Sequence, residues 1–147
     1  MNGSRWIAGV CIIGCAVSVG AYAWLTAKIG IWINPLSLFM QMTLLSRLII
    51  LAIGLTLARG VQLAISGREL TPRHGIRPGM LPALMAIMLG AFGAAHAWWQ
   101  TRPGNYLYCG EEPVPFQAFA DLYLEMAVSL LVGFSAALAL LVLHSKR

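Results

Sequence analysis

The sequence predicts an all-α integral membrane protein, a bundle of four transmembrane helices with both ends of the chain in the cytoplasm. Three observations lead to this prediction. Of the 147 residues, 59% are hydrophobic and only 10% are charged, whereas a soluble domain has about 25% charged residues. Four apolar segments are each long enough to cross a bilayer core of ~30 Å as a helix. The basic residues gather in alternate connectors between these segments.

The apolar segments set the expected elements of a single membrane domain that covers residues 1–147. We expect helices at approximately 6–27, 36–65, 80–99 and 116–143. Asn34-Pro35 is a helix-start signal ahead of the second helix, because Asn caps a first turn and Pro fits its first position. The second and fourth segments are longer than a perpendicular span requires, so they tilt or protrude. The connectors contain Gly and Pro and are predicted to be loops.

The distribution of Lys and Arg predicts the orientation. Cytoplasmic connectors of membrane proteins carry an excess of these residues. One side of the predicted bundle has Arg5, Arg59, Arg68, Arg73, Arg77, Lys146 and Arg147, and the other has only Lys28 and Arg102. We therefore expect a multi-pass protein of the cytoplasmic (inner) membrane with both termini inside. An aromatic belt at the outer interface would contain Trp32, Trp98, Trp99, Tyr106 and Tyr108.

The cysteines leave two alternatives open. Cys11 and Cys15 are four residues apart and share one helix face, while Cys109 lies in a loop. Buried apolar thiols are favoured over a metal site. The stretch from Arg5 to Cys15 is similar to a lipoprotein signal in which Cys15 would be acylated, but we favour an uncleaved first helix, because the apolar run continues past Cys15 to Ala27. We expect no cofactor, no metal and no enzyme activity, because no nucleophile, metal cluster or cysteine pair is evident.

Ionisable residues within a span are costly and therefore indicate function. The candidates are Arg47, His96, Asp121 and Glu125, all expected in the outer leaflet. Arg47 and Glu125 lie at similar depth on different helices, and Asp121 shares a helix face with Glu125. One hypothesis is an ion or proton path through Glu125. The other, which we favour, is a structural ion pair between Arg47 and Glu125. For His96, an interfacial hydrogen bond is favoured over ligation of a metal or haem.

Small residues predict where helices approach closely. Gly90 and Gly93 lie on the third apolar segment, and Gly133, Ala136 and Ala137 lie on the fourth. Stripes of small residues allow membrane helices to pack with short interaxial distances. We expect these two helices to pack against each other or against other copies of the chain. The bilayer is the first partner of the chain, and nothing in the sequence predicts nucleic-acid binding.

Three stretches resemble the MotA/TolQ/ExbB family. Leu36-Ser37-Leu38-Phe39 followed by Leu44–Leu51 is similar to the first transmembrane helix of TolQ and ExbB. Glu125–Ala137 resembles the last helix of the family, with Glu125, Gly133, Ala136 and Ala137 in matching positions. Gly93 and His96 fit the preceding helix. The resemblance implies an oligomeric complex in which the subunits surround a single-helix partner and couple proton flow to work.

The sequence departs from the family pattern at positions that matter for conduction. Gly90 and Leu130 stand where the family has channel threonines, and the helix at 6–27 is additional. We therefore expect this chain to act as a scaffold in such a complex rather than as its channel. The alternative is a small accessory or anchor subunit of a larger secretion or respiratory membrane complex, without transport activity. Other membrane subunits would then be its partners.

Overall fold

The computed structural model is all-α, and it describes residues 3–30, 34–66, 80–101 and 116–145. Side chains at 3–4, 35, 116–118 and 145 are outside that description, as are Cys109 and the basic connector at 67–79. The helices are α1 (Gly3–Ile29), α2 (Pro35–Gln41), α3 (Leu44–Ile65), α4 (Met80–Gln100) and α5 (Phe116–Ser145). Four of them are long and apolar enough to cross a membrane. The predicted all-α fold with four such helices is confirmed.

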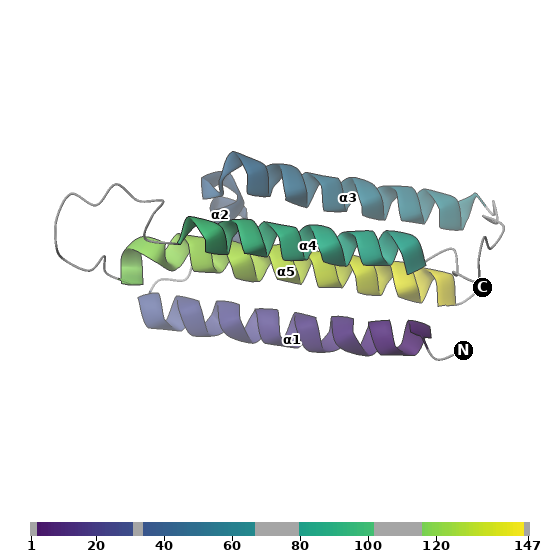
Figure 1. Ribbon diagram of the computed structural model, residues 1–147, viewed down its shortest axis with the longest axis horizontal. Coiled ribbons are helices and arrows are strands. Elements are labelled where there is room, and N and C mark those ends of the chain that lie inside the picture. Colours follow the sequence, from purple (N-terminus) through teal and green to yellow (C-terminus); the bar gives the residue numbers. More distant parts are fainter. Residues whose placement is uncertain (1–2, 31–33, 67–79, 102–115, 146–147) are drawn as a thin grey trace.

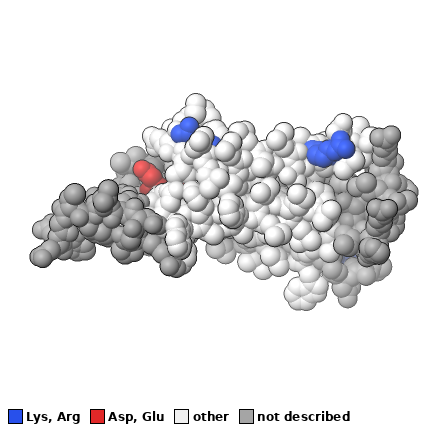
Figure 2. Space-filling model, turned by 45° about the horizontal axis from the view of Figure 1, so that its top comes forward, with Lys and Arg blue, Asp and Glu red and all other residues white. Residues whose placement is uncertain are grey.

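The long helices lie side by side along one axis, and the chain reverses direction at each connection (Figure 1). As a result, the start of α1 and the end of α5 lie at the same end of the bundle, which we call the terminal end. The other end contains α2 and the start of α5 and is called the break end. The face in Figure 2 carries its charges near these two ends, with a broad uncharged band between them. This distribution suits a bundle whose middle lies in lipid.

The central helix of the bundle is α5, which packs against α1, α3 and α4. Its closest neighbour is α4, because Gly90 and Gly133 meet where the two helices cross. A Cβ atom added to Gly133 would lie 2.9 Å from both the Cα of Gly90 and the carbonyl oxygen of Ala86. Backbones that approach this closely gain dispersion contacts along the whole crossing, which is how small residues associate helices in lipid.

The contact between α1 and α5 follows a seven-residue repeat. Cys11, Ser18 and Leu25 are all buried on one face of α1, which is the spacing of helices that pack at a shallow angle. Gly14 lies on the same face, where an added Cβ would fall 2.5 Å from the ring of Phe134. The opposite face of α1 is exposed and apolar, with Trp6, Val10, Ile13 and Val17 among its residues.

The segment at 36–65 forms two helices instead of the single expected helix. The chain leaves helical geometry at Met42 and Thr43, whose ψ angles are 153° and 150°. Asn34 caps the short α2 by accepting a hydrogen bond from the amide of Leu36 at 3.0 Å. Leu38 and Met42 anchor α2 in a cluster with Leu25 of α1 and Leu124 of α5. The break therefore lies inside the bundle, beside the expected site residues.

Candidate functional site at the helix break

The break between α2 and α3 exposes backbone groups that helices cannot satisfy internally. The first amides of α3 and the last carbonyls of α2 have no intrahelical partner. In a membrane each such group costs several kcal/mol unless the protein supplies a partner. Met42 is 3% exposed, so water does not hydrogen-bond these groups at this point. Two charged side chains bond them instead, one on the amide side of the break and one on the carbonyl side.

Glu125 of α5 meets the amide side. Its carboxylate accepts a hydrogen bond from the Thr43 hydroxyl, with 2.8 Å between Oγ1 and Oε1. Its Oε2 lies 3.4 Å from the Thr43 amide nitrogen, which donates to it. Glu125 is only 3% exposed, and its negative charge faces the positive end of the α3 dipole. The buried carboxylate is therefore stabilised by the start of a helix.

Thr43 and Ser46 complete the cap of α3. The amide of Ser46 donates to Thr43 Oγ1 at 3.4 Å, and the two hydroxyl oxygens lie 3.1 Å apart. Each hydroxyl has a single hydrogen. Because the Thr43 hydrogen is directed to the carboxylate, the Ser46 hydroxyl donates to Thr43. Ser46 is fully buried, so these bonds form a closed polar cluster inside the bundle.

Arg47 serves the carbonyl side of the break. Its Nε donates to the carbonyl oxygen of Met42 at 2.8 Å, and its Nη2 donates to the carbonyl of Met40. A guanidinium presents several N–H donors in a fixed fork, which matches two neighbouring carbonyls at the end of α2. Arg47 therefore ties the start of α3 to the end of α2.

The expected direct ion pair is not what the structure shows. Among the contacts of the described residues, Arg47 and Glu125 do not bond each other. Both instead bond residues of the same break, on its opposite sides. The reason is local: Arg47 has carbonyl acceptors five and seven residues before it, at the end of α2, and Glu125 has the start of α3. The break thus separates the two charges by supplying each with backbone partners.

The remaining ionisable candidates lie around this cluster. Asp121 is exposed on α5 and has no bond to another described residue. His96 Nε2 lies 3.2 Å from the side-chain nitrogen of Gln100. Two buried atoms have no hydrogen-bond partner in the described part of the chain, His96 Nδ1 and Ser129 Oγ. Ser129 lies one turn from Glu125 on α5, and it faces Gly93 of α4.

The described part of the chain includes two cysteines and several side chains of the types that bind metals. No group of three His, Cys, Asp or Glu side chains lies close enough there to hold a metal ion. Cys11 and Cys15 are free thiols on α1, Cys11 buried and Cys15 partly buried.

Thr43, Ser46 and Ser129 are the site residues that we did not predict from the sequence. The signal for the first two was present, because Thr at a helix start with a polar residue three positions later is a capping pattern. It was hidden by the apolar residues on both sides. No family model, curated protein or solved structure matches the chain. The relation to the MotA/TolQ/ExbB family therefore stays a prediction based on the residues quoted above.

Proposed function

We propose that this chain is a non-conducting scaffold subunit of an oligomeric complex in the cytoplasmic membrane, with a role similar to that of TolQ, ExbB and MotA subunits in organising partner helices. The observation that carries the proposal is the use of Glu125. Its carboxylate bonds Thr43 at the start of α3. A carboxylate held by these bonds acts as a structural clamp.

The core beyond this cluster supports the same function. Between Ser129 and the terminal end, the buried residues of α3, α4 and α5 are apolar or glycine. They include Ile53, Ala83, Ala86, Ala136, Ala137 and Leu140. A proton needs a continuous series of polar groups or water to cross a membrane. The crossing of Gly90 and Gly133 fills this region with backbone atoms, and the lack of such a series among the described core residues supports a chain that does not conduct protons.

Proton flux tests the absence of conduction. We expect the purified chain in proteoliposomes to give the same flux as empty liposomes under an imposed pH gradient, with a protonophore added at the end to establish full collapse. Glu125→Gln should not change that result. A flux above the empty-liposome level that Glu125→Gln abolishes would instead establish a channel and contradict the proposal.

The central position of α5 favours a second candidate function. In the MotA/TolQ/ExbB family, which the sequence resembles, the subunits surround a partner helix, whereas here α1, α3 and α4 all pack on α5. A chain whose own helices pack around its central helix suits an accessory or anchor subunit of a secretion or respiratory complex. Native mass spectrometry of the complex extracted in mild detergent separates the two. Several copies of the chain per complex support the scaffold, and one copy among unrelated subunits supports the accessory subunit.

A further inference from the structure

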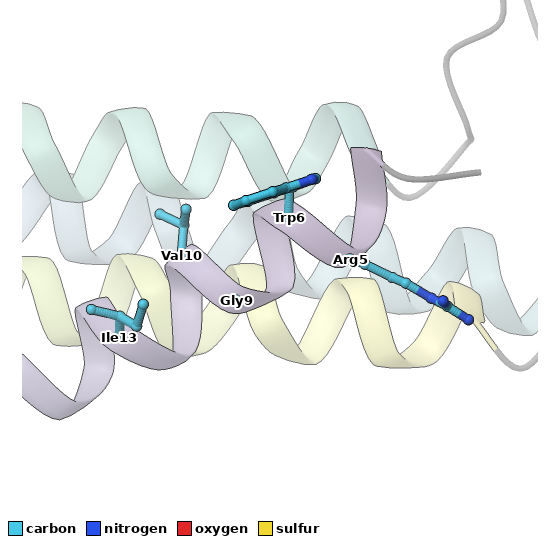
Figure 3. Close-up of a pocket in the computed structure, with 5 residues that line it drawn as sticks. All are labelled: Arg5, Trp6, Gly9, Val10 and Ile13. Atoms are coloured by element: carbon cyan, nitrogen blue, oxygen red, sulfur yellow. The ribbon is translucent and has the colours of Figure 1, made fainter.

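The outer face of α1 contains a hollow near the terminal end, and its lining residues belong to that one helix. The residues are Arg5, Trp6, Gly9, Val10 and Ile13. Figure 3 shows the side chains of Trp6, Val10 and Ile13 placed around Gly9, with Arg5 extending toward the N-terminal end of the helix. The hollow exists because position 9 has no side chain. An added Cβ there would meet nothing within 4 Å.

The position of the hollow points to lipid as its occupant. Its residues lie on the face of α1 opposite to the buried Cys11, and Trp6 is 75% exposed. The candidate span of α1 begins at Arg5, so the hollow begins at the membrane surface and continues into the hydrocarbon. Trp is typical of that interfacial level. The lining below it is aliphatic, as an acyl chain requires.

The positive charge of Arg5 favours one class of lipid in the hollow. Arg5 makes no hydrogen bond or ion pair with another described residue, in contrast to Arg47 and to Arg59, which bonds Gln62 at 2.7 Å. A guanidinium forms strong, directional bonds with phosphate oxygens. A basic residue at the membrane surface favours anionic headgroups over zwitterionic ones. Arg5 therefore supplies a headgroup contact at the membrane-surface end of the aliphatic groove.

We propose that this face of α1 is a binding site for one anionic phospholipid, with the phosphodiester on Arg5 and an acyl chain in the groove over Gly9. Glycine weakens a helix interior by about 1 kcal/mol relative to alanine, and at Gly9, as at Gly20 and Gly54, no neighbour requires the small size; of these three, Gly9 lines the hollow. At Gly14, Gly60 and Gly133, by contrast, an added Cβ would collide with a side chain or backbone of α5 or α4.

Native mass spectrometry of the purified full chain tests the site, with phosphatidylglycerol and phosphatidylcholine of identical acyl chains added in equal amounts. We expect wild-type protein to retain one phosphatidylglycerol preferentially. Arg5→Gln should lower that retention about fivefold, the effect of one basic residue at an anionic surface. Gly9→Leu should fill the groove and also lower retention. The controls are Arg59→Gln, a second arginine near the terminal end, and Gly20→Leu, an open glycine on the same helix; both should behave as wild type.

Each alternative occupant gives a different result. Equal loss in Arg5→Gln and Arg59→Gln, or no loss in Gly9→Leu, would mean general surface attraction and would overturn the site. Displacement of phosphatidylglycerol by soluble glycerol phosphate would show a simple anion site and would also overturn it. If Gly9→Leu abolished self-association and left lipid retention unchanged, the face would be an interface between copies of the chain, and the proposal would again be wrong.

Discussion

A carboxylate among apolar helices is stable only where hydrogen-bond donors reach it, and for Glu125 these donors belong to Thr43. The amide and hydroxyl of Thr43 both donate to it, and Thr43 in turn caps α3. One residue of α5 therefore fixes where α3 begins. Arg47 has the matching role at the end of α2, because it bonds the carbonyls of Met40 and Met42. The expectation from depth alone, that these two charges pair directly, missed these nearer backbone partners.

A double-mutant cycle tests the bond between Glu125 and Thr43. We expect Thr43→Val and Glu125→Leu each to lower the free energy of unfolding in detergent by about 1–3 kcal/mol, because each leaves a buried polar partner without its bond. The double variant should lose at least 0.5 kcal/mol less than the sum, the coupling typical of residues in contact. Thr56→Val is the matched control, since the Thr56 hydroxyl bonds Ala52 of its own helix at 2.8 Å. Its effect should add to that of Glu125→Leu.

The same measurement separates the two arrangements of the charges. In the structure Arg47 bonds backbone carbonyls, so the cycle of Arg47→Leu with Glu125→Leu should show weaker coupling than the cycle with Thr43→Val. Stronger coupling to Arg47 than to Thr43 would mean that the two charges pair directly in the folded protein. The capping role of Glu125 would then be incorrect.

At the scale of elements, hydropathy located the long helices but could not locate the break. Each span is apolar over many residues, so the average is robust; the mean hydropathy of the α3 span is 2.1. The break involves only Met42 and Thr43, and Met42 is itself apolar. One of its bonding partners is Glu125, a residue 82 positions away from Thr43. The capping residues Thr43 and Ser46 lie within an apolar segment, and the carboxylate that Thr43 bonds is distant in sequence, which is why the sequence predicted one helix at 36–65 and the structure has two.

The prediction at the scale of elements concerns the stability of the crossing between α4 and α5. Gly90→Ala and Gly133→Ala should each destabilise the protein by about 1–3 kcal/mol, because the added Cβ would overlap backbone atoms of the partner helix and extra volume in a filled core costs that amount. Gly54→Ala is the control, since nothing lies within 4 Å of a Cβ added on α3 there. Thermal unfolding in one detergent measures all three. Equal melting temperatures for the Gly54 and Gly133 variants would contradict the close crossing.

At the scale of the whole molecule, the polar and apolar halves of the core are separated. Among the described side chains of α3 and α5, the buried polar ones are Ser46, Glu125 and Ser129; Ser46 and Glu125 lie toward the break end and Ser129 near the middle of α5. The described core toward the terminal end is apolar. A bundle built this way is held by bonded polar groups at one end and by close packing at the other. The structure places the start of α1 and the end of α5 at the terminal end, but the side of the membrane that this end faces follows only from the sequence.

Cysteine accessibility tests the orientation. The excess of Lys and Arg predicts that the terminal end is cytoplasmic. A membrane-impermeant thiol reagent applied to intact spheroplasts should then label Cys109, which belongs to the connector expected outside. A cysteine placed at the exposed Ser66, which caps the end of α3, should stay unlabelled in a Cys109→Ser background until the membrane is permeabilised. Cys11 and Cys15 lie within the α1 span and should react in neither case. Labelling of Ser66→Cys in intact spheroplasts would reverse the orientation, because Ser66, the start of α1 and the end of α5 share the terminal end, and would also place Arg5 and its proposed lipid at the outer surface.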